Sequence, residues 1–395
     1  MEIFVATAPG LESITAGELK ALGVRGNQQP GGVSFSGDNR LLYLVNLHLR
    51  TPSRVIVRLG SFHVSTFYEL ERRLKKIAWQ NFLVPGSSVD VRATCRKSRL
   101  YHSDAVAERV VAAISDAGVR VEAQRGQLEV DDNGDETITE GDGPQLFVVR
   151  IVNDQVEISA DSSGELLYRR GYRREVAKAP LRETLAAAMI LASGWRSDSP
   201  LVDPMCGSGT IPIEAAMIAR RIAPGLRRKF RFMRWPSFDA GLWKDLVLKA
   251  EAEIIDGGTY TIRGADRDAG AIEAAARNAE RAGVSGDIAF ATQSVSVTLD
   301  SLTEVDGEAW LLTNPPYGIR VGEPDLRNLY ARLGSVIERK PGWRLGLLAA
   351  EPRLARHTGV TLRSRFETRN GGISVAFLAA EKAGKSAATP RDSGR

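Results

Sequence analysis

The segment Asp203-Pro204-Met205-Cys206-Gly207-Ser208-Gly209-Thr210 decides the fold of the second half of this 395-residue chain. It follows the apolar pair Leu201-Val202 and precedes apolar residues at helical spacing, so its glycines lie where a strand turns into a helix. The first backbone N–H groups of a helix have no partner inside the helix and bind small anionic ligands. The segment therefore predicts a ligand-binding turn at the carboxyl end of a strand.

A glycine-rich turn of this kind has three other interpretations. Two of them, a dinucleotide site and a nucleoside triphosphate site, are excluded. Cys206 and Ser208 interrupt the dinucleotide motif, and the turn lacks the Gly-Lys-Ser/Thr of a triphosphate loop. The third, a turn that only reverses the chain, stays open on this segment alone.

A second segment, Asn314-Pro315-Pro316-Tyr317, ends the apolar run Trp310-Leu311-Leu312. Such a run indicates a buried parallel strand, and the carboxyl ends of parallel strands meet at one edge of their sheet. Proline is also common in strand-ending turns without a function. Two prolines between a side-chain amide and an aromatic ring favour a functional site instead. The two segments together predict a catalytic crevice.

Apolar runs alternate with helical periodicity from about residue 166 onward, which predicts an α/β domain with a parallel sheet. Strands are expected at 201–202, 260–265, 288–291, 310–313, 344–350 and in a last pair ending at 374–379. The connection between the first helix and Tyr260 is too long for one crossover, so we expect an insertion that builds substrate surface. Residues 1–60 and 61–165 have the patterns of two small α+β modules, and the polar tail 382–395 is expected to be disordered.

Composition excludes several classes of protein. No run approaches the roughly 18 apolar residues of a membrane span, and the amino terminus lacks the basic-then-apolar pattern of a signal peptide. We therefore expect a cytoplasmic protein without a membrane partner. Cys95 and Cys206 are too few for a disulfide framework and have no metal-ligand spacing to the four histidines, so no metal is expected.

Basic residues are clustered along the chain. The net charge is only +5 and the pI about 9.2, so the distribution of charge matters more than its sum. Residues 220–234 carry seven Lys or Arg and no acid, interleaved with Phe230 and Phe232 and followed by Trp235. A solvated charge run is the usual alternative, but the aromatic residues favour phosphate contact with base stacking. The nucleic-acid-binding residues predicted here are Arg227, Arg228, Lys229, Arg231 and Trp235.

Both quoted segments resemble those of class I S-adenosylmethionine-dependent methyltransferases that modify exocyclic base nitrogens. More narrowly, the chain resembles the THUMP-domain guanine-N2 RNA methyltransferases, in their bacterial 23S rRNA branch. The resemblance extends over nearly the whole chain. It also rests on residues 4–12 (Phe-Val-Ala-Thr-Ala-Pro-Gly-Leu-Glu), 97–102 (Lys-Ser-Arg-Leu-Tyr-His) and 179–186 (Ala-Pro-Leu-Arg-Glu-Thr-Leu-Ala).

The resemblance implies an α/β fold in three parts. A seven-stranded Rossmann-like sheet with an antiparallel last strand is expected in 166–381. A ferredoxin-like module is expected in 1–60 and a THUMP RNA-binding domain in 61–165. In the THUMP domain, Lys97 and Arg99 would contact phosphate with His102 nearby; each alone is also compatible with a surface charge or a packed histidine at a helix start.

The resemblance also implies S-adenosylmethionine as the cofactor. Gly207 and Gly209 would let the backbone approach its methionine portion, and Asp203 would accept a hydrogen bond from its ammonium group. Asp266 would accept both ribose hydroxyls. The alternatives are an acid interacting with the helix dipole for Asp203 and a surface turn for Asp266. Asp268 is expected to cap the helix that follows.

The adenine pocket departs from the family pattern. An aspartate usually follows the third strand, whereas this chain has Phe290-Ala291-Thr292-Gln293-Ser294 there. Adenine recognition would then rest on Gln293, Ser294 or backbone groups. The predicted cofactor-binding residues are Asp203, Pro204, Cys206, Gly207, Gly209, Thr210, Asp266, Gln293, Ser294 and two residues before the first strand, Pro180 and Thr184. The last two are equally compatible with a helix start.

The second segment would carry the reaction. The Asn314 side-chain oxygen and the Pro315 carbonyl would accept the two N–H bonds of an exocyclic amine, which orients its lone pair toward the methyl group. Pro316 stiffens the loop together with Pro315, and Tyr317 would stack on the base. The base must leave its stack to reach this pocket.

The motif itself does not separate guanine N2 from adenine N6. The RNA-type amino-terminal modules favour an RNA substrate and N2-methylguanosine, in 23S rRNA before tRNA. Adenine-N6 methylation is the next alternative. An RNA-binding ribosome-assembly factor with a methyltransferase fold is the alternative from another class of protein.

Overall fold

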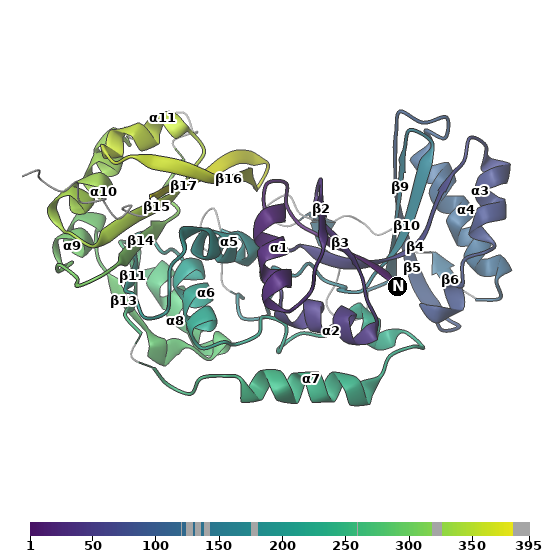
Figure 1. Cartoon of the computed structure of the whole chain (residues 1–395), viewed down its shortest axis with the longest axis horizontal. Helices are drawn as coiled ribbons and strands as arrows, with labels where there is room; N and C mark the ends of the chain where they lie inside the picture. Colours follow the sequence, from purple (N-terminus) through teal and green to yellow (C-terminus); the bar gives the residue numbers. More distant parts are fainter. Residues whose placement is uncertain are drawn as a thin grey trace, which may run out of the picture.

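A computed structural model describes residues 1–119, 121–123, 129–130, 136–137, 143–174, 181–258, 260–317 and 326–381. Pro180 and the tail 382–395 lie outside the described residues. Two large sheets organise this part of the chain, one of eight strands and one of seven, besides a two-stranded ribbon of β7 (Glu129–Val130) and β8 (Glu136–Thr137). Figure 1 shows the two sheets at opposite ends of the molecule with α1 (Glu12–Ala21) between them.

The eight-stranded sheet belongs to the first 165 residues and has the order β2-β3-β1-β4-β10-β9-β5-β6. Its central strand β4 (Arg54–His63) pairs with β1 on one side and β10 on the other, across the boundary predicted at residue 60. The two predicted modules therefore share one continuous sheet. The other strands are β1 (Glu2–Ala6), β2 (Asn27–Gln29), β3 (Gly32–Ser36), β5 (Ser87–Arg96), β6 (Val121–Ala123), β9 (Gln145–Val152) and β10 (Gln155–Asp161).

Helices cover this sheet because their apolar residues repeat at helical spacing. Val106 and Val110 of α4 (Ser103–Asp116) are fully buried beside Leu70 and Leu74 of α3 (Phe67–Leu74) in one hydrophobic core. A capping box of Thr66 and Glu69 begins α3. The α2 helix (Asn39–His48) completes this half.

The seven-stranded sheet has the order β13-β12-β11-β14-β15-β17-β16 and confirms the predicted fold class. Five strands run parallel and β17 runs antiparallel to β15, as expected for the last strand. The strands are β11 (Leu201–Asp203), β12 (Ile262–Asp266), β13 (Ile288–Thr292), β14 (Ala309–Thr313), β15 (Trp343–Ala349), β16 (Leu362–Asn370) and β17 (Ile373–Ala380). Every residue of β14 is buried, as for a central strand covered on both faces.

Helices flank the strands of this sheet. They are α5 (Glu183–Ser193), α6 (Thr210–Ala219), α8 (Ala269–Ala282), α9 (Val295–Asp300), α10 (Arg327–Arg339) and α11 (Pro352–Ala355). Among the described residues no helix is both long and apolar enough to cross a membrane.

The long connection before β12 holds the two halves of the molecule together, and its expected part in a substrate surface stays a prediction. Phe232 stacks on Tyr43 of α2 with ring centroids 4.4 Å apart, and both are buried. The helix α7 (Ala240–Ala252) packs against α2. Figure 1 shows α7 running below α1 and α2, away from its own sheet. The aromatic residues of this segment therefore belong to the core of the amino-terminal half.

A buried charge cluster also joins the two halves. Glu214 of α6 has no exposed surface, and its Oε1 accepts a hydrogen bond of 3.1 Å from the Tyr172 hydroxyl. The Arg170 guanidinium lies 3.4 Å from the same oxygen, and Arg50, from the amino-terminal half, lies 3.8 Å from Oε2. Arg50 also donates to the carbonyl of Ile222, 2.5 Å away. Two buried cations thus share one carboxylate.

The amino-terminal half also touches β16. Gly10 has a φ of +89°, and a Cβ added there would overlap the backbone carbonyl of Glu367 in β16. Its N–H donates to Glu12 across 2.7 Å, which fixes the turn. Leu11 is buried in the core of the carboxyl-terminal domain. Figure 1 shows the β16–β17 hairpin reaching toward α1 at this contact.

We predict that Glu214→Gln lowers the free energy of unfolding by about 3–5 kcal/mol, because Arg50 and Arg170 would stay buried without the carboxylate that both contact. The control is Glu308→Gln, which removes the ion pair between Glu308 and Arg344. The Glu308 side chain is 41% exposed, so this change should alter stability by less than about 1 kcal/mol. Urea unfolding followed by circular dichroism measures both. Equal effects would contradict the assignment.

We also predict that Gly10→Ala loosens the contact between the two halves. Gly23→Ala is the matched control, since Gly23 has a φ of +78° and nothing within 4 Å of an added Cβ. Both variants carry the backbone strain of about 1–2 kcal/mol, but only Gly10→Ala adds a clash with β16. The thermal midpoint should therefore fall further for Gly10→Ala than for Gly23→Ala, and faster proteolysis between the halves is expected for Gly10→Ala alone.

Candidate active site

Three polar residues lie at the carboxyl ends of neighbouring strands. Asp203 ends β11, Asp266 ends β12, and Asn314 directly follows β14. These strands are adjacent and parallel, with β11 in the middle. The structure therefore brings together the two segments singled out in the sequence, at the edge of the sheet where ligands bind in open α/β folds.

Asp203 connects β11 to the end of β14. Its Oδ1 accepts hydrogen bonds from the Thr313 hydroxyl at 2.8 Å and from the Met205 N–H at 3.1 Å. The side chain is buried, and this burial raises the pKa of Asp203 to about 7, with a further rise from the nearby Asp266. Asp203 is thus a carboxyl group that readily changes its charge near neutral pH. Thr313 was not predicted, although a polar residue at the end of an apolar run is a usable signal.

The glycine turn has the conformation that glycine favours. Gly207 and Gly209 have φ values of +53° and +86°. A Cβ on Gly209 would lie 2.9 Å from the Cβ of Ala275 and 3.2 Å from the ring of Phe290. Gly209 is therefore required for the packing of α6 against α8, which is a different reason from the close approach to a ligand expected from sequence.

Asp266 is oriented by the turn and by its own loop. Its Oδ2 accepts from the Gly207 N–H at 3.0 Å, and its Oδ1 accepts from the Asp268 N–H at 3.0 Å. Each carboxylate oxygen keeps a lone pair for a ligand. Asp268 accepts from the N–H groups of Gly270 and Ala271, which confirms that it caps α8.

Gln293 has an unused acceptor. Its backbone N–H donates to the Asp266 carbonyl at 2.9 Å. Its side-chain Oε1 is buried and has no hydrogen-bond partner among the described residues. Ser294 instead caps α9 and accepts from the Val297 N–H at 3.4 Å. Of the two candidates for adenine recognition, Gln293 is the one with a free side-chain acceptor.

The remaining cofactor candidates line or support the turn. Pro204, Cys206 and Thr210 are buried, and the Cys206 N–H donates to the Ala265 carbonyl at 2.9 Å. Burial raises the pKa of the Cys206 thiol, so it stays protonated. Thr184 is buried in the first turn of α5.

The Asn-Pro-Pro-Tyr segment contains a chain of hydrogen bonds. The Tyr317 hydroxyl donates to Asn314 Oδ1 at 3.0 Å and accepts from Asn370 Nδ2 at 3.0 Å. Burial raises the pKa of Tyr317 to about 12, so the phenol stays neutral and remains a donor. Pro315 is buried and Pro316 is exposed. Asn370 was not predicted, because an asparagine before Gly371-Gly372 reads as a hairpin turn.

Two predicted nucleic-acid contacts are wrong. Trp235 is only 5% exposed and donates to Gln145 at 2.8 Å, so it has no free face for a base. Arg228 donates to the carbonyls of Leu166, Arg169 and Glu165 at 2.7–2.8 Å, and burial lowers its pKa to about 10. Both side chains hold the long connection against the amino-terminal half.

Other basic residues of the prediction are accessible. Arg227 and Lys229 are exposed, and Arg231 is half-buried. In the middle of the chain Lys97, Arg99 and His102 are all exposed. The Asp154 side chain holds this loop through a bond of 2.7 Å from the Arg99 N–H.

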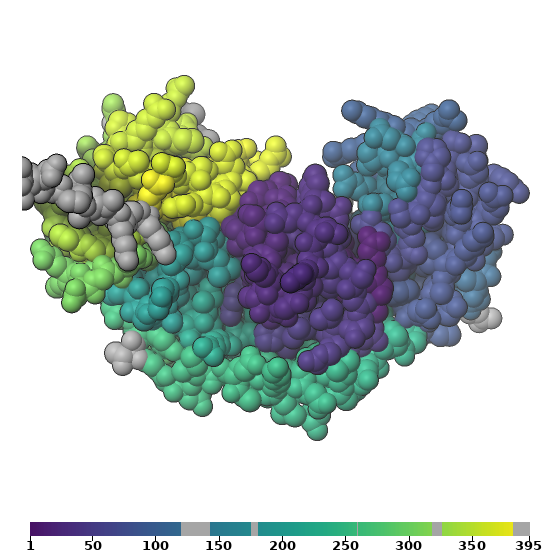
Figure 2. All heavy atoms as spheres, viewed as in Figure 1, coloured from purple at the N-terminus to yellow at the C-terminus, as the bar shows by residue number. Residues whose placement is uncertain are grey.

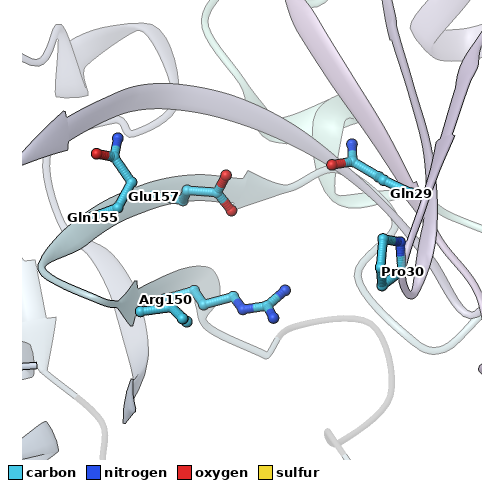
Figure 3. A pocket seen from close by; sticks show the side chains of 6 residues that line it. Gln29, Pro30, Arg150, Gln155 and Glu157 are labelled. Carbon is cyan, nitrogen blue, oxygen red and sulfur yellow. The ribbon is translucent and has the colours of Figure 1, made fainter. Parts of the chain in front are cut away.

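A surface cleft of about 280 Å³ lies in the amino-terminal half, far from the strand ends described above. Figure 3 shows Gln29 and Pro30 of the β2–β3 turn on one side and Arg150 and Glu157 of the β9–β10 hairpin on the other. Figure 2 shows the hollow between the purple and blue parts of the surface. Among the described residues no group of three or more His, Cys, Asp or Glu could hold a metal ion.

Two family models match the chain. An RMKL-like methyltransferase domain matches residues 170–377, and an RlmL ferredoxin-like domain matches residues 2–56. A putative RNA methyltransferase of Synechocystis is 32% identical over 380 residues, covering 95% of both chains. A ribosomal RNA large subunit methyltransferase K/L of Syntrophotalea carbinolica is 35% identical over 389 residues. This second match covers 95% of this chain, which spans only 53% of the length of that relative.

A solved structure extends the likeness to the cofactor. The putative methyltransferase SMU.472 in complex with SAH superimposes with a TM-score of 0.83 at 28% identity, covering 97% of this chain and 99% of that one. The glycine turn, the two strand-end aspartates and the unpaired Gln293 oxygen fit S-adenosylmethionine. The chain therefore belongs to the RMKL-like methyltransferases, class I enzymes that use S-adenosylmethionine.

Proposed function

We propose that this protein transfers a methyl group from S-adenosylmethionine to the N2 amine of a guanosine in RNA, in 23S rRNA. The observation that carries this proposal is the placement of Asn314. It follows Thr313, which is bonded to the buried Asp203, and its Oδ1 is oriented by Tyr317. An amide acceptor fixed beside the cofactor edge suits an exocyclic amine. Both relatives described above are RNA methyltransferases by name.

Asp266 is proposed to accept the ribose hydroxyls, because both of its oxygens are aligned and keep free lone pairs. Gln293 Oε1 is proposed to accept from the adenine amine, which would satisfy this buried atom. Asp203 is proposed to hold the ammonium group, directly or through water. Pro204, Cys206 and Thr210 would complete the pocket around the glycine turn, with Pro180 and Thr184 over the methionine end.

The exocyclic amine of the target base would become reactive through the way the protein orients it. Its two N–H bonds would be accepted by Asn314 Oδ1 and the Pro315 carbonyl, which turns the nitrogen lone pair toward the methyl group. The cofactor supplies that methyl on a positively charged sulfur. The new N–C bond forms as the C–S bond breaks, and the methylated nitrogen then loses a proton to water. Tyr317 is proposed to stack on the base, with its hydroxyl held by Asn314 and Asn370.

The RNA is proposed to reach this site over cations that are at least partly exposed, in both halves. Lys97, Arg99 and His102 lie on the loop between β5 and α4, and Arg227, Lys229 and Arg231 lie on the long connection. Such contacts position the RNA without reading its sequence, so their loss should weaken binding in a salt-dependent way.

We predict that Asn314→Ala abolishes methyl transfer, with a drop in kcat of at least about 100-fold, because the amine loses its oriented acceptor. The assay is transfer from labelled S-adenosylmethionine to rRNA and tRNA purified from cells that lack the protein, with nucleosides identified by mass spectrometry. N2-methylguanosine in rRNA alone is the expected product. Binding of SAH by the variant is the control for folding.

Other outcomes would change the conclusion. N2-methylguanosine in tRNA would move the substrate to the second candidate, and N6-methyladenosine would keep the mechanism but change the base. No product despite SAH binding would favour an RNA-binding assembly factor.

We also predict that SAH binding weakens as the pH falls below about 7. Burial raises the pKa of Asp203 to about 7, so its carboxyl is protonated below that pH, whereas an ammonium ligand requires the ionised form. The affinity should fall by up to about tenfold per pH unit. Calorimetry in buffers of different ionisation enthalpy measures the proton released. Asp203→Asn should bind weakly at every pH and release no proton; an unchanged pH profile would contradict the role of Asp203.

A further inference from the structure

The inner face of β16 carries two polar atoms that nothing in the described structure satisfies. Thr368 and Asn370 are each 7% exposed and lie on the same face of the strand, two residues and about 7 Å apart. Thr368 Oγ1 and Asn370 Oδ1 are buried without a hydrogen-bond partner among the described residues. Buried polar groups are nearly always paired, so these two neighbouring atoms are available to a ligand that binds beside them.

The hydrogen bonds of Tyr317 fix the orientation of the Asn370 amide. The phenol has one proton, which it donates to Asn314 Oδ1, so it can only accept from Asn370. Asn370 must therefore present its Nδ2 to Tyr317 and turn its Oδ1 away. Because the phenol stays neutral, with its pKa raised to about 12, this arrangement is kept across the working pH range.

Asn370 lies at the active-site edge of the sheet, close to Asn314. β16 runs antiparallel to β17, which runs antiparallel to β15, so Asn370 ends its strand at the same edge as Asn314. The Tyr317 hydroxyl bonds the side-chain amides of both Asn314 and Asn370, each at 3.0 Å, so the two amides lie on either side of one oxygen atom. When the exocyclic amine of a base binds Asn314, the neighbouring ring nitrogen N1 on the Watson–Crick edge of that base therefore lies near Asn370.

Guanine and adenine differ at that next atom. In guanine, N1–H stands beside the N2 amine and is a donor. In adenine, the N1 beside the N6 amine is an acceptor and would repel a carbonyl oxygen. A buried carbonyl therefore selects guanine and rejects adenine, since the wrong base would leave it unpaired.

We propose that Asn370 is the residue that selects guanine, its Oδ1 accepting the N1–H of the base whose N2 amine is bound by Asn314. This inference rests on the proposed guanine-N2 activity and adds its source of specificity. Thr368 Oγ1 lies on the same face, so this wall of the pocket is polar beyond a single atom.

The test uses a synthetic RNA fragment that spans the nucleotide methylated by the wild-type protein. One form carries guanosine at that position, and the other carries 2-aminopurine riboside, which keeps the amine but has a lone pair at N1 and no oxygen at C6. Wild-type protein should prefer guanosine by at least about tenfold in kcat/KM. Asn370→Ala should lose most of its activity on guanosine and most of this preference.

Further variants separate recognition from folding. Ser374→Ala, at an exposed position of the same hairpin, should leave the preference unchanged. Tyr317→Phe keeps the ring but frees the Asn370 amide, so it should lose part of the preference. SAH binding should match the wild type in all three variants. If Asn370→Ala does not bind SAH, the preference of Tyr317→Phe decides the question.

Two results would overturn the inference. The first is a full preference for guanosine in Asn370→Ala that binds SAH. The second is equal use of both RNAs by the wild-type protein. A wild-type protein that forms no N2-methylguanosine in any RNA would instead remove the proposed function on which the inference stands.

Discussion

The arrangement of the molecule depends on the buried carboxylate of Glu214. This residue lies one turn into α6, the helix that begins at the glycine turn. It holds Arg170, from the segment between β10 and α5, and Arg50, from the amino-terminal half. Removing water from three charged groups is unfavourable, and only their mutual attraction and hydrogen bonds offset it. The cofactor turn and the amino-terminal half consequently have one fixed relative position.

Two further contacts reinforce that position. The long connection places Phe232 against Tyr43, and the Gly10 turn lies against β16. The second contact is the closer one to the chemistry, because β16 carries Thr368 and Asn370. The half of the molecule that carries the exposed loop 97–102 is thus packed directly on a strand of the active-site edge. RNA bound by that half would meet a pocket whose distance from it is set by the fold.

Much of the catalytic domain could be predicted from the sequence because its signals are local. An apolar strand, a glycine turn and a helix follow one another between residues 201 and 219, and Asn314-Pro315-Pro316-Tyr317 directly follows its strand. The other residues depend on contacts between distant parts of the chain. Asn370 meets Tyr317 across 53 positions, and Arg50 meets Glu214 across 164, so neither has a neighbouring signal.

The basic and aromatic run at residues 220–235 shows why two nucleic-acid contacts, Arg228 and Trp235, were wrongly predicted from composition. Arginine beside aromatic residues is typical of nucleic-acid surfaces, but arginine is also suited to binding several backbone carbonyls at once. Arg228 does the latter with three carbonyls, while Phe230, Phe232 and Trp235 fill a core. The rings are covered by residues far away in the sequence, Tyr43 of α2 against Phe232 and Phe82 against Trp235, which the composition of the run does not reveal.

The polar groups of the active site form a nearly continuous series along the edge of the sheet. Gly207 bonds Asp266 at the end of β12, Asp203 of β11 bonds Thr313 of β14, and Asn314 joins Tyr317 and then Asn370 of β16. All but the bond from Tyr317 to Asn314 cross from one strand or loop to another, so the groups orient one another before any ligand arrives. Such preorganisation means that little reorganisation is needed when charge moves during methyl transfer. Gln293 Oε1 at one end and Asn370 Oδ1 at the other have no partner within the described part of the chain, and we propose that the cofactor and the base complete the series there.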